Sequence, residues 1–114
     1  MIELVAFSSE TRPPQHYGDG DHVILTRVSI NTDGVYDPST GVFTVPYDGE
    51  YSINYSCHFP DIVVMVDSHI YNETDHSSFV HLRVNQKVWL RSVGENVVGP
   101  GDCFIGVSLQ KKDE

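Results

Sequence analysis

The segment between residues 33 and 55 constrains the fold most strongly, because tight turns alternate there with short runs of β-forming residues. Gly34, Gly41 and Gly49 permit backbone conformations that a side chain would penalise. Pro38 and Pro46 fix the backbone angle and remove a hydrogen-bond donor at the turn edges. This punctuation predicts short strands joined by tight turns.

The residues after Gly49 alternate between apolar and polar side chains. Tyr51, Ile53 and Tyr55 fall on one face of an extended chain, and the polar residues between them fall on the other. A period of two is typical of a strand with one buried face, so the sequence predicts a β core here.

The rest of the chain repeats this pattern of short apolar runs separated by glycine and proline, and no segment requires a helix. We therefore expect an all-β fold, a two-sheet jelly-roll sandwich of about eight to ten antiparallel strands. The polar stretch from Glu10 to His22 is expected to be a surface loop. The predicted strands span about 4–8, 23–31, 42–45, 51–59, 62–71, 79–84, 88–93 and 104–110.

One run, Ile62–Val66, is continuously apolar and does not alternate. Such a strand is expected to be covered on both faces. Two arrangements achieve this: a position at the centre of a sheet, or a cover provided by a neighbouring subunit.

Length and composition indicate one small domain spanning residues 1–114, large enough to bury a core without disulfides or metals. The chain has no run approaching the ~20 apolar residues of a membrane span, so membrane insertion is not expected. Lys and Arg number 7 against 16 Asp and Glu, which argues against nucleic acid and anionic membranes as partners. A cation, or a basic or neutral ligand, suits this charge better.

Spaced residues across the chain resemble the signature of the globular C1q domain, in the C1q and tumour-necrosis-factor superfamily. Two flanking blocks add to the likeness, Val88–Leu90 with Cys103–Val107 near the end and Val5–Ser8 at the start. Two phenylalanines of the family signature are smaller aliphatic residues here, and the spacing is otherwise kept. The matching positions are Leu25, Asn31, Tyr36, Phe43, Gly49, Tyr51, Ile53 and Tyr55.

The resemblance implies a TNF-like jelly roll that assembles as a homotrimer, whereas the residues by themselves are also compatible with a monomer. Catalysis is not expected, because the chain shows no nucleophile elbow and no arrangement for an oxyanion hole. Seven residues are expected to pack in the core, namely Tyr36, Phe43, Gly49, Tyr51, Tyr55, Phe104 and Gly106.

The function implied by the resemblance is a secreted, trimeric, lectin-like recognition head of innate immunity. Its ligand would be a microbial polysaccharide, lipopolysaccharide or a protein receptor, bound with avidity through three copies. A second interpretation is a structural or adhesive trimerisation tip of a collagen-like or fibre protein. A third is a cytokine-like ligand for a receptor, which shares the fold and differs in its partner.

The acidic loop after residue 66 is similar to the place where several relatives bind calcium. Glu73 and Asp75 occupy positions that resemble the acidic ligands of that family, and carboxylates from three subunits with water could supply the oxygens that calcium needs. The alternative interpretation is a solvated acidic loop without a metal.

Two further sites concern covalent chemistry. Asn72 begins an N-glycosylation sequon in this loop. Cys57 and Cys103 could form one disulfide. Strand alternation argues against the pair, since it places Cys57 towards the core and Cys103 on the opposite side of the sheet, and two separate thiols are the alternative.

Overall fold

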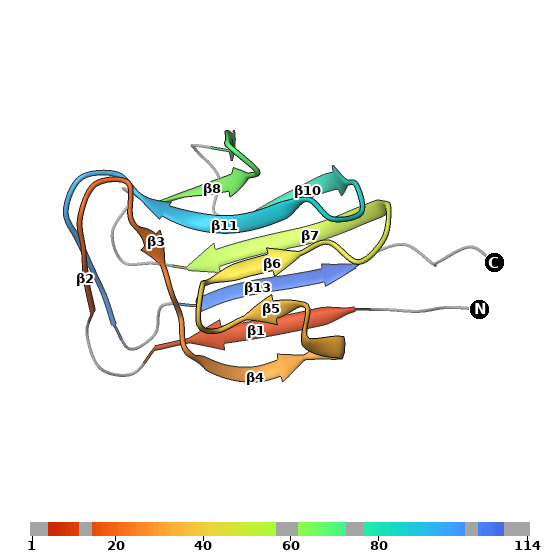
Figure 1. The fold of residues 1–114 in the computed structure, drawn as a ribbon, viewed down its shortest axis with the longest axis horizontal. Helices are drawn as coiled ribbons and strands as arrows, with labels where there is room; N and C mark the ends of the chain where they lie inside the picture. The colour runs from red at the N-terminus through yellow and green to blue at the C-terminus, as the bar shows by residue number, and fades with distance from the viewer. Residues whose placement is uncertain (1–4, 12–14, 57–61, 73–76, 100–102, 109–114) are drawn as a thin grey trace.

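The computed structural model describes residues 5–11, 15–56, 62–72, 77–99 and 103–108. These residues form short antiparallel strands, and their one helical element is a 3-10 turn at Thr32–Gly34 (Figure 1). The strands are β1 (Ala6–Glu10), β2 (Gln15–Tyr17), β3 (His22–Val23), β4 (Arg27–Asn31), β5 (Tyr36–Asp37), β6 (Val42–Thr44), β7 (Gly49–Ser56), β8 (Ile62–Val66), β9 (His69–Asn72), β10 (Ser77–Leu82), β11 (Lys87–Ser92), β12 (Asn96–Val98) and β13 (Cys103–Ser108).

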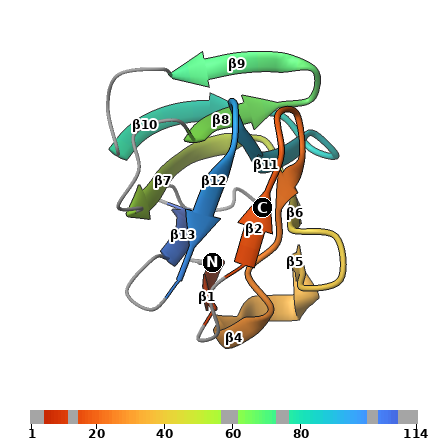
Figure 2. The same ribbon diagram turned by 90° about the vertical axis from the view of Figure 1, so that its left-hand side faces the viewer.

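The strands build two sheets that pack face to face. The five-stranded sheet has the order β10-β7-β13-β1-β4, and the six-stranded sheet has the order β5-β6-β11-β8-β9, with β3 also pairing with β11. Strands β2 and β12 form a separate two-stranded ribbon, which Figure 2 shows lying across one end of the sandwich. The predicted class, an all-β jelly roll of two antiparallel sheets, is confirmed.

The predicted strand at 23–31 is divided in two by the structure. β3 belongs to the six-stranded sheet and β4 to the five-stranded sheet, so the chain crosses between the layers at residues 24–26. Leu25 is fully buried at this crossing, and its backbone is held by the Tyr36 hydroxyl. Because the buried Leu25 continues the apolar pattern through the crossover, the sequence predicted one strand where the structure has two.

The predicted strand at 62–71 is a hairpin of β8 and β9. The chain reverses at Asp67, whose φ of 54° lies in the left-handed region. The neighbouring strand β11 holds this turn, because the Asp67 amide donates to the Lys87 carbonyl at 2.7 Å and the Asp67 carboxylate accepts from the Lys87 amide at 3.0 Å. Contacts with a distant strand stabilise this turn, and Asp67 and Ser68 include no glycine or proline. The sequence therefore contains no local signal for it.

The expected surface loop at Glu10–His22 contains β2. This strand pairs with β12, and His16 lies opposite Val97 in the register. Strand β8 lies between β11 and β9, with Ile62, Val63, Val64 and Met65 all buried. The central position predicted as one alternative for the continuous apolar run is therefore the one that the structure shows.

Aromatic rings fill the space between the two sheets. The Phe7 ring stacks on Tyr36 at a centroid distance of 5.0 Å and meets the edge of Phe104 at 5.0 Å. Phe43 packs on Phe7 at 4.9 Å and on Tyr51 at 5.8 Å. All of these side chains are buried, as are Tyr55, Gly49 and Gly106 from the predicted core set.

Hydrogen bonds explain the spacing of Leu25, Asn31 and Tyr36. The Tyr36 hydroxyl donates to the Leu25 carbonyl at 3.0 Å and accepts from the Leu25 amide at 3.2 Å. The Asn31 side-chain amide donates to the Tyr36 carbonyl at 2.8 Å, and its oxygen accepts from the Tyr36 amide at 3.0 Å. The three signature positions thus fix the crossover and the following turn as one unit.

The buried tyrosines make stability sensitive to alkaline pH. Burial raises the pKa of Tyr51 from 10.0 to about 12, and burial also raises the pKa of Tyr36. Between pH 10 and 12 the unfolded chain loses these protons before the folded chain does, so stability should fall as pH rises through this window. Denaturant titrations across it should show a falling midpoint, and Tyr51→Phe should flatten the fall. Equal slopes for both proteins would contradict the assignment.

Candidate functional site: the outward face of the five-stranded sheet

The outward face of the five-stranded sheet is built from small and aliphatic side chains. Alternation along β13 directs Phe104 to the core and Ile105 and Val107 outward. Residues opposite each other in the register share a face, which gives one row of Ile30, Ser8, Ile105 and Asn54 and a second row of Ala6, Val107 and Ser52. Neither row contains a charged residue.

The charged residues of this face lie at its corners. Glu10 pairs with Arg27 at 3.6 Å, at one end of β1 and β4. The Glu50 carboxylate lies 2.7 Å from Nδ1 of His81, on β7 and β10 at the other end. Ile30 is 54% exposed, the highest value among the large hydrophobic side chains that the structure describes. An uncharged centre with charged corners is the composition expected of a face that another protein covers.

The residues predicted to bind calcium, Glu73 and Asp75, lie outside the described residues, and calcium therefore stays a prediction. Within the described ranges, no group of three or more His, Cys, Asp and Glu side chains is placed to hold a metal ion. Asn72 is the last residue of β9, and glycosylation at its side chain also stays a prediction.

Of the two cysteines, Cys103 belongs to the described residues and Cys57 does not. Cys103 begins β13, opposite Ser56 in the register, and its half-buried side chain lies on the outward face as alternation predicts. Cys57 lies outside the described residues, so the disulfide stays a prediction.

The resemblance implied that the outer face of one sheet becomes a subunit interface, but sequence reasoning did not identify which sheet or which residues form it. The alternation of residues 103–108 was visible, but it shows only that one face of that strand is buried. Which strands flank β13 depends on the sheet order, and only that order brings Ser8, Ile105 and Asn54 into one row.

The fold and this face can be compared with known proteins. The profile of the C1q domain matches residues 6–103. The chain belongs to the C1q domain family. C1q domains typically form trimers and are commonly extracellular. Within the described part of this C1q domain, no helix has the length and apolar character needed to cross a membrane.

A solved structure supports the fold independently. The globular domain of zebrafish complement 1qA protein is similar to this chain with a TM-score of 0.72 and 12% sequence identity, over 96% of this chain and 100% of that chain. At this identity the likeness shows the shared fold and says nothing of ligands.

Proposed function

We propose that this C1q domain forms a homotrimer through the outward face of its five-stranded sheet and serves as a secreted recognition head. The observation that carries the proposal is the uncharged centre of that face, where Ile105, Val107 and Ile30 stand among serine, alanine and asparagine. The ligand class is a microbial polysaccharide, lipopolysaccharide or a protein receptor, and the domain binds it without catalysing a reaction. Three copies on one assembly raise the avidity for a repeated ligand.

Charge placement supports a face that is covered by protein. The domain carries a formal net charge of −9, so its copies repel each other at long range. Association requires a contact surface that keeps carboxylates away from its centre, because a buried unpaired charge costs several kcal/mol, on the order of 3–5. The two central rows meet this requirement, since the charged pairs lie at the corners.

Replacement of Ile105 by glutamate should dissociate the trimer. The change places a carboxylate in the centre of each subunit contact, which should lower the mass in solution from three times 12.8 kDa to 12.8 kDa at micromolar concentration. Light scattering coupled to size exclusion measures this directly. The matched control is Val42→Glu, an aliphatic residue on the outward face of the opposite sheet. A wild-type monomer, or a trimeric Ile105→Glu variant, would show that this face is not the contact.

The recognition role has a separate test. Binding to immobilised bacterial polysaccharides should be saturable and should weaken in the Ile105→Glu variant, because the variant loses avidity. Repeating the binding and mass measurements with calcium and with a chelator tests the predicted role of Glu73 and Asp75. An intact trimer that binds none of these ligands would favour the structural tip.

A further inference from the structure

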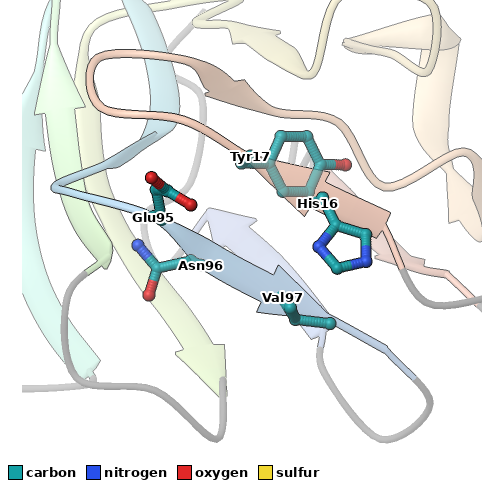
Figure 3. Close-up of a pocket in the computed structure, with 5 residues that line it drawn as sticks. All are labelled: His16, Tyr17, Glu95, Asn96 and Val97. Carbon is teal, nitrogen blue, oxygen red and sulfur yellow. The ribbon is translucent and has the colours of Figure 1, made fainter.

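A cavity of about 160 Å³ lies at the ribbon that crosses the end of the sandwich. His16 and Tyr17 of β2 line one side, and Glu95, Asn96 and Val97 line the other, as Figure 3 shows. The two sets are joined by the antiparallel register of β2 and β12, in which Tyr17 lies opposite Asn96.

The floor of the cavity is held rigidly. The Tyr17 hydroxyl donates to the Ile24 carbonyl at 3.0 Å and accepts from the Ile24 amide at 3.2 Å, which fixes the ring. The buried Asn96 side-chain amide donates to the Ser92 hydroxyl at 2.7 Å and to the Val93 carbonyl at 3.2 Å. A pocket whose walls are fixed before a ligand arrives loses little conformational entropy on binding.

Two polar side chains at the opening of the cavity, those of His16 and Glu95, are available to a ligand. Among the residues that the structure describes, the side chains of Glu95 and His16 take part in no hydrogen bond or ion pair, and both are exposed. A carboxylate accepts hydrogen bonds and carries negative charge, and a neutral imidazole offers one further acceptor. Val97, which lies opposite His16 in the register, supplies apolar surface next to them.

The carboxylates around the cavity favour a cationic ligand. The adjacent turns place two more carboxylates beside this end of the ribbon, since Asp19 accepts from the Gly94 amide at 2.8 Å and Asp21 accepts from the Gly18 amide at 2.7 Å. Together with the net charge of −9, these groups repel anions and attract cations. An acidic sugar or a phosphate therefore does not suit the cavity.

We propose that this cavity binds an ammonium group carried on a short apolar stem. The stem contacts Val97, and the Glu95 carboxylate, two residues away on the same face of the strand, receives the charge. Two sources present this chemistry: a lysine side chain of a protein partner and the free amine of an amino sugar. Because His16 and Glu95 are exposed to solvent, a single such group is expected to bind with a dissociation constant on the order of millimolar.

Amide chemical shifts of the ¹⁵N-labelled chain test the proposal. Nα-acetyl-lysine methylamide should shift the signals of residues 15–17 and 95–98 in a saturable way, and the same compound acetylated on its side-chain nitrogen should not. Glucosamine and N-acetylglucosamine form the second pair of probes. Saturation by the lysine probe alone identifies a protein partner, and saturation by glucosamine alone identifies an amino sugar.

Two variants sharpen the test. Glu95→Gln should weaken binding of the amine roughly three- to tenfold, since it keeps the shape of the side chain and removes its charge. The matched control is Asp33→Asn, which removes one exposed carboxylate from the 3-10 turn Thr32–Gly34 and keeps a residue that tolerates its φ of 53°. This turn follows β4, and Figure 1 shows it at the end of the sandwich opposite to β2. Equal binding of charged and acetylated probes, or equal weakening by both variants, would overturn the proposal. The mass in solution of Glu95→Gln should stay that of the wild type, so failure here is distinguishable from failure of the trimer.

Discussion

Phe104→Ala should lower the free energy of unfolding by about 3–5 kcal/mol, the cost of truncating a fully buried phenylalanine. The side chain is 0% exposed, and its ring meets Phe7 edge-on at 5.0 Å and Tyr36 at 6.0 Å. The neighbouring rings cannot collapse into the space because each is held by another contact, Phe7 by Phe43 and Tyr36 by its hydrogen bonds to Leu25. The cavity therefore remains, and its cost adds to the lost apolar burial.

Denaturant unfolding followed by circular dichroism measures this loss. Subunit association stabilises the folded state and makes the midpoint depend on concentration, so the comparison belongs at several concentrations and also in the Ile105→Glu background. Val84→Ala is the control, because Val84 is about half exposed and should change stability by less than ~0.5 kcal/mol. A loss below ~1 kcal/mol for Phe104→Ala would mean that β13 presents the other face to the core.

The parts of the fold that could be predicted are those that local chemistry determines. Tyr51, Ile53 and Tyr55 alternate along β7, and all three are buried. The signature spacing of Leu25, Asn31 and Tyr36 corresponds to hydrogen bonds within eleven residues of sequence. Such contacts leave a pattern in the sequence because the partners lie close along the chain.

The parts that could not be predicted depend on distant partners. The turn at Asp67 is stabilised by Lys87 on another strand, and β2 is a strand because β12 pairs with it. Short polar strands of this kind have no apolar alternation to mark them. The cavity has the same origin, since residues 16–17 and 95–97 become neighbours only through the ribbon.

The uncharged face is an intermediate case. The alternation along each strand identifies the residues that point outward. Whether these residues form a charged, solvated surface or an uncharged surface that a partner covers becomes clear only when the neighbouring strands are aligned. Ser8 and Asn54 are unremarkable singly, and they become informative as the flanks of Ile105. The candidate contact surface is therefore identified by the order of the strands, which places β1, β13 and β7 side by side.

Gly106→Ala should destabilise the domain by about 1–3 kcal/mol, although it adds a single methyl group. A Cβ atom at this position would lie 2.3 Å from Cε2 of Phe7 and 3.0 Å from two further atoms of the same ring. The ring cannot turn aside, because Tyr36 stacks on it with an interplanar angle of 7° and Phe104 abuts it. The phenylalanine on β1 thus requires glycine on β13, directly opposite in the register.

A double-mutant cycle with Phe7→Leu separates this contact from other causes. Phe7→Leu alone should destabilise the domain by removing aromatic packing, but it also shortens the side chain that the new methyl group would strike. The double variant should therefore lose less stability than the sum of the two single losses, with a coupling of about 0.5–3 kcal/mol, measured by denaturant unfolding. Additive losses would mean that the cost of the added methyl group does not arise from the approach of Phe7.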